Sequence, residues 1–318
     1  SNLPASLQKL LATNFIFSTV NIEREQGRLQ TTQKFLWRLE DNQLVESVLI
    51  PANTSLYGET SDRYTLCVST QVGCAYGCRF CASGLEGFKR NLKPAEIVDQ
   101  VLSAERMQRG QRGNHTRLIT NLVIMGMGEP LANYPNLMSA LEILNSQWGA
   151  NIGARKITIS TSGLAPQIRK LAKEPHQYRL AVSLHGATDE IRNKLMPVNK
   201  KHPLSELIES IEEYQSSKNG MITLEYILIA GLNDNLSQAL ALGKIAKRLR
   251  AKLNLIPYNE VDEFQWERPR QSAQDAFLNK LIKLGVPATL RREKGHDIDA
   301  ACGQLRLRTE KELDANRS

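Results

Sequence analysis

From about residue 64 onwards, short apolar runs alternate with longer segments in which apolar residues recur every three or four positions. The short runs are typical of buried strands, and the longer segments have the period of amphipathic helices. Strands are predicted at 65–71, 121–125, 156–161, 179–184, 222–228 and 252–256. Helices are predicted between and after them at 94–109, 134–145, 165–173, 204–215, 235–250 and 273–284.

Strands that alternate with helices of this length predict parallel βαβ units and an α/β fold. A closed barrel of this kind needs eight units. The six strand–helix units here therefore predict an open, partial (β/α)6 barrel. One more strand, at 288–292, leads into a loop at 295–303 that contains Gly and Asp.

The residues before the barrel predict a small helix-plus-hairpin extension. An amphipathic helix is expected at 3–11, and the segments 31–39 and 44–50 have the pattern of a hairpin. We expect three parts: an N-terminal accessory domain at 1–60 that is shorter than a complete one, a catalytic barrel at 61–305 and a tail at 306–318.

Composition narrows the class of protein. With 318 residues, 41% apolar and 23% charged, the chain matches a soluble globular enzyme. Its apolar runs fall short of the roughly 18 residues that a membrane helix needs, and its start has no signal-peptide pattern. Five cysteines, three of them clustered, do not suit a disulfide framework. We therefore expect a cytoplasmic protein without a membrane segment.

The chain is basic, with a formal net charge of +8 and a pI near 9.2. Several basic clusters in one globular enzyme predict a polyanionic partner, most simply nucleic acid, although no RNA-recognition signature is present. The clusters are Lys89/Arg90/Lys93, Arg106/Arg109/Arg112, Lys200/Lys201, Lys244/Lys247/Arg248/Arg250 and Arg291/Arg292/Lys294.

Cys74, Cys78 and Cys81 form a CxxxCxxC triplet with an aromatic residue before the last thiol. Three thiolates can hold three irons of a 4Fe–4S cluster and leave the fourth open to chelate S-adenosylmethionine and reduce its sulfonium. The alternatives are a zinc site or buried structural thiols. Structural zinc takes four ligands, usually as two CxxC pairs, and the sequence has no second pair. We interpret the triplet as a radical-SAM cluster site.

Polar residues follow several predicted strands, at the ends where ligands gather in parallel α/β sheets. Gly128 and Glu129 follow the second strand, where they can approach a ligand amine, although a plain turn broken by proline is the alternative. Ser160 ends the third strand and Ser183-Leu184-His185 the fourth. Each can bind a ribose or a carboxylate, but a lone Ser or His is more often a capping or core group. Asn259, after the sixth strand, can bind adenine or ribose.

Two cysteines lie outside the triplet. Cys67 is within the first predicted strand, where the simplest interpretation is a small buried hydrophobic residue. Cys302 lies in a Gly- and Asp-rich loop after the last strand, which favours a nucleophile, subject to its pKa.

Taken together, these segments closely resemble the RlmN/Cfr family of radical-SAM RNA adenine methyltransferases, from about residue 30 to 305. All five cysteines coincide with functional cysteines of the family. The matching segments are Cys67-Val-Ser-Thr-Gln-Val-Gly-Cys74, the triplet, Met125-Gly-Met-Gly-Glu-Pro130, Ser160-Thr-Ser-Gly163, Ser183-Leu-His185 and Asp297-Ile-Asp-Ala-Ala-Cys-Gly-Gln-Leu305.

The family has two branches. RlmN enzymes methylate carbon 2 of an adenine in 23S ribosomal RNA and in tRNA anticodon loops, whereas Cfr enzymes methylate carbon 8 of the ribosomal adenine and confer antibiotic resistance. Glu129-Pro130, the Ser-Thr-Ser-Gly segment and Ile256-Pro-Tyr-Asn259 look like RlmN, which we favour. Asn133 and Tyr258 lean toward Cfr. A short N-terminal part, Arg306-Leu-Arg308 and the segment Trp266 to Arg270 depart from the family pattern and leave RNA specificity open.

The resemblance implies a 4Fe–4S cluster, two molecules of S-adenosylmethionine per turnover and a mechanism through a methylated cysteine. Cys302 would carry the methyl group, Glu46 would accept the adenine proton, and Cys67 would attack the Cys302 sulfur to release product as a disulfide forms. Without the resemblance, Glu46 would be interpreted as an exposed strand carboxylate. The implied S-adenosylmethionine residues are Gly128, Glu129, Ser160, Ser183, Leu184, His185 and Asn259.

Ribosomal RNA and tRNA are the implied partners, with an external flavodoxin-like electron donor, and we expect a monomer. Two other hypotheses stay open on the residues alone. One is a radical-SAM enzyme that acts on a non-RNA substrate, such as a glycyl-radical activase. The other is a zinc-bearing RNA-binding module without catalytic activity.

Overall fold

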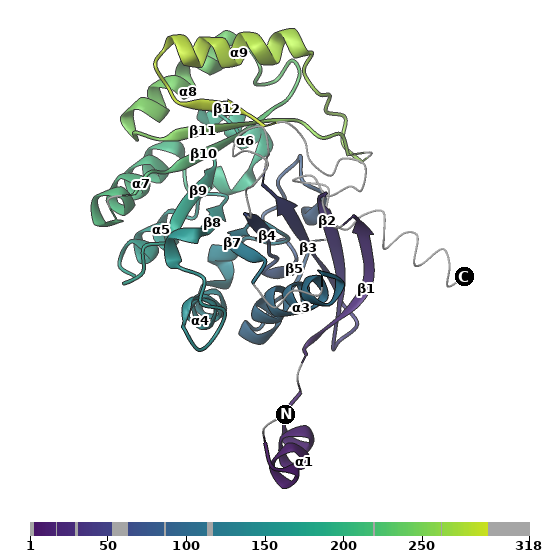
Figure 1. Cartoon of the computed structure of the whole chain (residues 1–318). Coiled ribbons are helices and arrows are strands. Elements are labelled where there is room, and N and C mark those ends of the chain that lie inside the picture. The colour runs from purple at the N-terminus through teal and green to yellow at the C-terminus, as the bar shows by residue number, and fades with distance from the viewer. Residues whose placement is uncertain are drawn as a thin grey trace.

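The computed structural model describes residues 3–16, 18–28, 31–52, 63–85, 87–112, 117–218, 220–261 and 263–291. Within these residues, ten strands form one sheet in the order β1-β2-β3-β4-β7-β8-β9-β10-β11-β12 (Figure 1). Neighbouring strands run parallel from β4 to β12 and antiparallel from β1 to β4. Because β1 and β12 are opposite edges, the described sheet does not close, and the predicted open α/β barrel is confirmed.

Each predicted barrel strand and helix is present, with its ends shifted by a few residues at most positions. The parallel strands are β4 (Tyr64–Cys67), β7 (Ile119–Ile124), β8 (Ile157–Thr161), β9 (Arg179–Ser183), β10 (Thr223–Leu228), β11 (Lys252–Pro257) and β12 (Ala288–Leu290). The predicted helices are α3 (Pro94–Arg112), α4 (Tyr134–Asn145), α5 (Ala165–Ala172), α7 (Leu204–Lys218), α8 (Leu236–Arg248) and α9 (Gln271–Lys283). No described helix is both long and apolar enough to cross a membrane.

The first predicted strand is wrong in its second half. It leaves the main sheet after Cys67, and β5 (Gln71–Gly73) pairs instead with β6 (Phe88–Asn91) in a separate two-stranded ribbon. The side chain of Ser69 explains the break, because its hydroxyl donates to the carbonyl oxygen of Glu46 at 2.6 Å and accepts from the amide of Met127 at 2.8 Å. The triplet cysteines lie in the segment that connects β5 to β6.

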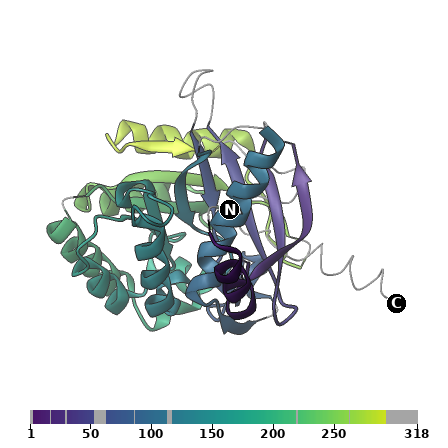
Figure 2. The ribbon, with the colours of Figure 1, turned by 60° about the horizontal axis from the view of Figure 1, so that its bottom comes forward.

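The N-terminal part contains α1 (Ala5–Asn14), β1 (Val20–Gly27), β2 (Gln33–Leu39) and β3 (Leu44–Pro51). The predicted helix and hairpin are confirmed. Strand β1 is present in addition, and the sequence did not predict it. The hairpin is not a separate sheet, because Val48 of β3 pairs with Cys67 of β4. Figure 2 shows the teal and green barrel helices gathered to one side of these purple strands. The expected boundaries at 60/61 and 305/306 lie outside the described residues.

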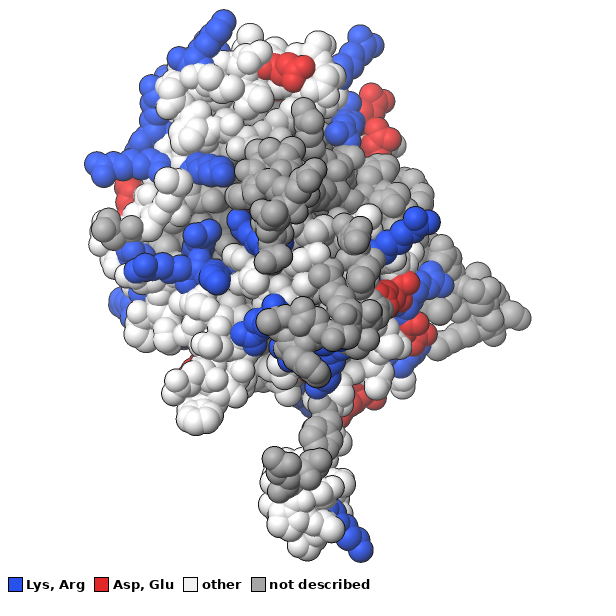
Figure 3. Space-filling view, in the orientation of Figure 1, with Lys and Arg blue, Asp and Glu red and all other residues white. Residues whose placement is uncertain are grey.

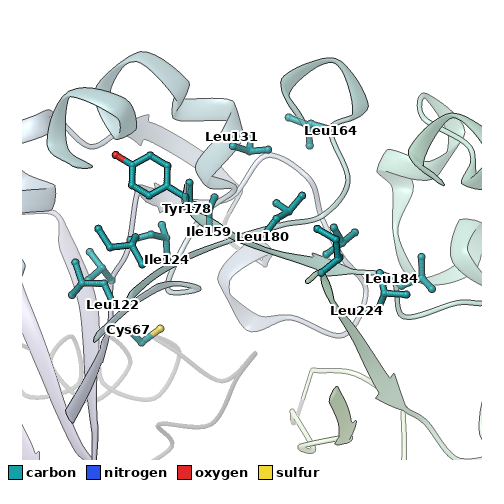
Figure 4. Packing of buried hydrophobic residues seen from close by; sticks show 14 of the residues in the cluster. Cys67, Leu122, Ile124, Leu131, Ile159, Leu164, Tyr178, Leu180, Leu184 and Leu224 are labelled. Atoms are coloured by element: carbon teal, nitrogen blue, oxygen red, sulfur yellow. The ribbon is translucent and has the colours of Figure 1, made fainter. Parts of the chain in front are cut away.

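The two faces of the parallel sheet differ in polarity. In a strand, alternate side chains point to opposite faces. One face is apolar and packs into the core with the helices, and Figure 4 shows Leu122, Ile124, Ile159 and Leu180 there. By register, the opposite, inner face carries a row of polar side chains from β8 to β11, with Ser183 paired to Glu225 and Glu225 paired to Asn254. The inner face is therefore equipped to bind a polar ligand.

Candidate active site

A cavity of about 150 Å³ lies at the carboxyl ends of the barrel strands. This is the location that the sequence predicted for the polar ligand-binding residues. It is lined by residues at the ends of β7, β8 and β9, by residues of β10 and β11, and by residues of the cysteine loop. Its lining includes Cys74, Tyr76, Cys78, Phe80, Cys81, Ser83, Gly128, Glu129, Ser160, Thr161, Ser162, Ser183, His185, Met196, Glu225, Ile227 and Ile256.

All three triplet cysteines line this cavity, and a tight backbone approach fixes their loop. The amide of Cys74 donates to the carbonyl oxygen of Gly87 at 3.1 Å. Gly73 has a φ of +72°, and a Cβ atom there would lie 1.9 Å from the same oxygen. Glycine is therefore required immediately before the first thiol, because both the space and the conformation exclude a side chain.

The chemistry of these thiols fits an iron–sulfur cluster. Burial raises the pKa of Cys74 to about 12 and raises that of Cys78 well above its ordinary value. Thiolates at such sites need a bound cation, and a metal ion deprotonates the thiol that coordinates it. Among the described residues, no three His, Cys, Asp or Glu side chains converge on one metal-ion position. A cluster does not require such convergence, because each thiolate binds a different iron.

Glu129 connects the ends of β7 and β8. Its buried carboxylate accepts from the amide of Leu131 at 3.0 Å and from that of Ser162 at 2.6 Å. Burial raises its pKa, and these hydrogen bonds act in the opposite direction. Gly128 beside it has a φ of +95°, and a Cβ atom there would lie 2.4 Å from the Gln71 side chain. The turn thus brings both backbone and carboxylate to the cavity.

His185 presents a neutral ring at the end of β9. Burial, aided by the nearby Arg192 charge, lowers the pKa of His185 to about 3. Its Nδ1 accepts a hydrogen bond of 3.0 Å from the amide of Ile227. The proton of the neutral ring therefore resides on Nε2, which can donate to a ligand. The Phe80 ring packs edge-on against it, with the ring centroids 4.8 Å apart.

Arg192, which was not singled out from the sequence, binds the backbone at the ends of two strands. It is fully buried on α6 (Asp189–Leu195), a helix that the sequence analysis also missed. Its guanidinium donates to the carbonyl oxygens of Ser162, Ser183 and Leu184. Burial lowers its pKa to about 10, so the guanidinium stays charged at neutral pH.

The predicted residues do not all reach the cavity. Gly128, Glu129, Ser160, Ser183 and His185 line it together with the triplet. Leu184 and Asn259 are buried but are not among the described residues that line it. The carbonyl oxygen of Leu184 instead accepts a hydrogen bond from Arg192.

Glu46 and Cys67 share the inner face of the sheet. Val48 pairs with Cys67, and Glu46 lies two residues from Val48 on the same side of β3. The Glu46 side chain is fully buried, with one carboxylate oxygen 3.4 Å from Nζ of Lys34. The interpretation of Glu46 as an exposed strand carboxylate is therefore wrong. Cys302 lies outside the described residues.

Glu225 is the most informative lining residue that the sequence analysis missed. It is the one charged residue in the strand Thr-Leu-Glu-Tyr-Ile-Leu, and this is a signal that could have identified it. Buried charged side chains are rare unless they are paired or functional. The other lining residues that were not singled out include Tyr76 and Phe80 within the triplet motif, Ser162 within the Ser160-Thr-Ser-Gly163 segment, and Met196, which no motif marks.

Several residues of the predicted basic clusters are engaged in ion pairs. Arg90 pairs with Asp41 and Glu96, Arg106 with Asp99, Arg109 with Glu105 and Arg248 with Glu212. Their charge available to a polyanion is correspondingly reduced. Figure 3 nevertheless shows Lys and Arg side chains spread over the face seen in Figure 1. Lys200 and Lys201 lie just after α6, the helix of Arg192.

Comparison with known proteins agrees with this architecture. Residues 68–242 match the model of the Radical SAM superfamily. A crystal structure of a radical SAM methyltransferase from Sphaerobacter thermophilus superposes with a TM-score of 0.89 and 43% identity, covering 96% of this chain and 86% of that one.

Two sequence relatives cover almost the whole chain. A probable dual-specificity RNA methyltransferase RlmN of Akkermansia muciniphila is 56% identical over 318 residues, which are 100% of this chain and 87% of the relative. The dual-specificity RNA methyltransferase RlmN of Anaeromyxobacter dehalogenans is 44% identical over 307 residues, 96% of this chain and 80% of that protein.

Proposed function

Because the chain belongs to the RlmN family of radical-SAM RNA methyltransferases, we propose that it methylates carbon 2 of an adenine in 23S ribosomal RNA and in tRNA anticodon loops. Enzymes of this superfamily use a 4Fe–4S cluster and S-adenosylmethionine. The observation that carries the proposal is the meeting of the cysteine triplet with the polar ends of three barrel strands in one cavity.

In this proposal, Cys74, Cys78 and Cys81 hold the cluster, which supplies one electron to the sulfonium of S-adenosylmethionine. Glu129 accepts from the ligand amine, in addition to the two amides that it already binds. Ser160 and Ser183 contact the ligand from β8 and β9, and His185 donates from Nε2. Arg192 and Glu129 keep these strand ends in place so that the ligand meets a preformed surface.

The methyl transfer itself is assigned to Cys302, Glu46 and Cys67 by the family motifs. Carbon 2 of adenine is electrophilic, so direct displacement from S-adenosylmethionine does not methylate it. We propose that Cys302 receives a methyl group from one S-adenosylmethionine. One-electron cleavage of a second S-adenosylmethionine would give a radical that removes a hydrogen atom from this methyl group. The resulting carbon radical bonds to the adenine, Glu46 accepts the ring proton, and one electron would return to the cluster. Cys67 then attacks the Cys302 sulfur, the sulfur–carbon bond breaks as the sulfur–sulfur bond forms, and the released carbon takes up a proton to become the methyl group of the product.

The positions of Glu46 and Cys67 in the sheet support the roles proposed for them. By register, both lie on the inner face of the sheet, the face that also carries Ser160 and Glu225. Lys34 lies beside Glu46, with its Nζ 3.4 Å from one carboxylate oxygen.

We further propose that the protein acts as a cytoplasmic monomer and takes its electrons from a flavodoxin-like donor. The net charge of +8 supports binding to RNA, since phosphate contacts dominate such affinity.

The deciding experiment is anaerobic reaction of the reconstituted protein with S-adenosylmethionine, a reductant and fragments of 23S ribosomal RNA or tRNA. Mass spectrometry of the digested RNA should show 2-methyladenosine. The Cys67→Ala variant should accumulate RNA crosslinked to protein, and the double variant that also carries Cys302→Ala should not. Product at carbon 8 would reassign the chain to Cfr-type chemistry, and unmodified RNA would overturn the proposal.

A further inference from the structure

The turn between the second and third triplet cysteines is bonded to a tryptophan from the far end of the chain. The amide of Cys81 donates to the carbonyl oxygen of Cys78 at 3.1 Å, which closes a β-turn. Arg79 and Phe80 are the two central residues of this turn. The indole Nε1 of Trp266 donates to the carbonyl oxygen of Arg79 at 2.7 Å. A side chain 187 positions away thus holds the central peptide of the turn.

Two anchored parts of the barrel hold the turn from both sides. The amide of Arg79 donates to the carbonyl oxygen of Leu195 at 2.9 Å, at the end of α6. Trp266 lies in the segment between β11 and α9, and its side chain packs against the core. The next residue, Glu267, accepts at its carbonyl oxygen from the amide of Ala230 at 2.9 Å. Both backbone groups of Arg79 are therefore bonded to segments that are themselves fixed.

The bond from Trp266 fixes which edge of the central peptide faces the cavity. The peptide is trans, so its carbonyl and its N–H point in opposite directions. The Arg79 carbonyl is directed at Trp266, which is not among the described residues that line the cavity. Phe80 and the two cysteines of the turn do line it. The N–H of Phe80 is therefore directed to the side on which the thiols lie.

This amide of Phe80 has no hydrogen-bond acceptor within the described part of the chain. Phe80 is only 8% exposed, and buried backbone N–H groups are almost always paired. The sulfurs of an iron–sulfur cluster accept hydrogen bonds of this kind, and these bonds help to set its reduction potential. The unpaired amide therefore fits a cluster held by the triplet.

We propose that Trp266 is a positioning residue that holds the Cys78–Cys81 turn so that the Phe80 amide donates to a sulfur of the 4Fe–4S cluster. A donor beside the sulfur stabilises the reduced cluster, which carries one more negative charge, and so makes reduction easier. The inference rests on the proposed ligation by the triplet. It adds a residue from the segment 266–270, which departs from the family pattern.

Redox titration of the anaerobically reconstituted protein, followed by EPR without S-adenosylmethionine, tests this role. Trp266→Phe keeps an aromatic ring but removes the indole N–H. At a fixed potential, its ratio of reduced to oxidised cluster should be about tenfold lower than in the wild type. This is the effect of one hydrogen bond and corresponds to about 59 mV for a one-electron couple. Trp148→Phe is the matched control, because Trp148 is 91% exposed and outside the cavity lining, and it should leave the ratio unchanged.

Isotope labelling tests the Phe80 amide directly and needs no substitution. In wild-type protein that carries ¹⁵N only in phenylalanine, pulsed EPR of the reduced cluster should show a ¹⁵N hyperfine coupling. The coupling should be weaker in labelled Trp266→Phe. Phe88 directly follows Gly87, whose carbonyl oxygen binds the Cys74 amide, so it is the second residue to check. Labelled Phe88→Leu should keep the coupling.

The outcomes separate this inference from the proposed function. An unchanged ratio in Trp266→Phe would overturn the inference, as would equal shifts in Trp266→Phe and Trp148→Phe. Absence of the ¹⁵N coupling in the wild type, or its loss in Phe88→Leu, would also overturn it. If Trp266→Phe does not retain a cluster, the labelled wild-type and Phe88→Leu proteins decide. A wild-type protein that binds no iron would instead refute the proposed ligation.

Discussion

The guanidinium of Arg192 donates a hydrogen bond of 2.8 Å to the carbonyl oxygen of Ser183. The same nitrogen donates to the carbonyl oxygen of Leu184, and the other terminal nitrogen donates to that of Ser162, which directly follows the neighbouring strand β8. One buried side chain therefore fixes two strand ends that line the cavity. Its charge also lowers the pKa of the Cys78 thiol, which opposes the larger effect of burial.

Replacement of Arg192 by Met should leave these carbonyl oxygens buried without donors. We expect the free energy of unfolding to fall by about 3–5 kcal/mol, the usual cost of uncompensated buried polar groups. Urea denaturation of the apoprotein measures this change. The control is Arg155→Met, because Arg155 is exposed and, within the described part of the chain, donates to the side chain of Gln177; it should change stability by less than about 0.5 kcal/mol. Equal effects of the two substitutions would contradict this role.

Gly128→Ala should weaken both folding and ligand binding. The residue has a φ of +95°, and the added Cβ would lie 2.4 Å from the Gln71 side chain, whose Oε1 accepts from the Glu129 amide. We expect a loss of about 1–3 kcal/mol in unfolding free energy together with weaker binding of S-adenosylmethionine. Gly153→Ala is the matched control, since its Cβ has open space and its φ is −56°. A neutral Gly128→Ala protein would show that the turn adapts.

Glu46→Gln should stall the reaction after the RNA is attached. A glutamine cannot accept the ring proton, so turnover should fall by about 10²–10⁴-fold while crosslinked RNA accumulates. Gel shift of denatured protein and mass spectrometry of the RNA measure the two effects. Glu23→Gln, which changes a partly exposed carboxylate paired with Arg38, should keep wild-type turnover. Normal turnover of Glu46→Gln would exclude Glu46 as the base.

His185 should make the fold sensitive to acid. Its pKa is about 3 in the folded protein against an ordinary value of 6.5, so folding favours the neutral ring. The stabilisation is complete above pH 6.5 and is lost as the pH falls toward 3, by about 1.4 kcal/mol per pH unit. His185→Gln should flatten this part of the dependence of unfolding free energy on pH. An unchanged slope would mean that the ring is accessible to solvent.

Cys78→Ser should abolish the brown colour and the iron content of anaerobically reconstituted protein, because one of three cluster thiolates is removed. Cys67→Ser provides the control, since Cys67 lies on β4 outside the cavity lining and should leave the iron content unchanged. Iron analysis and visible absorption measure the difference. Equal iron in both variants would contradict ligation by the triplet.

Sequence patterns predicted the elements that depend on local periodicity. The predicted helix 134–145 has the same limits as α4, and each predicted barrel strand is present. Elements held mainly by tertiary contacts escaped prediction. The strand β1 has a polar sequence and forms by pairing with β2, and α6 is only seven residues long. The first barrel strand ends early because Ser69 bonds across to two other segments.

The site could be predicted where spacing carries chemistry. The triplet cysteines and the residues that follow β7, β8 and β9 meet in one cavity because parallel strands bring their carboxyl ends together. Glu225 and Arg192 were missed, because a single charged residue in a strand or in a short helix does not reveal that it will be buried at the same place. Asn259 and Leu184 were predicted from motifs. Neither of them is among the described residues that line the cavity.

The hydroxyl of Ser69 ties the backbone of Glu46 to the backbone of Met127, one residue before Gly128. Strand β3, which carries the proposed base Glu46, and the turn at Gly128, which we propose binds S-adenosylmethionine, are thus both hydrogen-bonded to the Ser69 hydroxyl. The relative position of Glu46 and this turn is therefore set when the chain folds, before the RNA substrate binds.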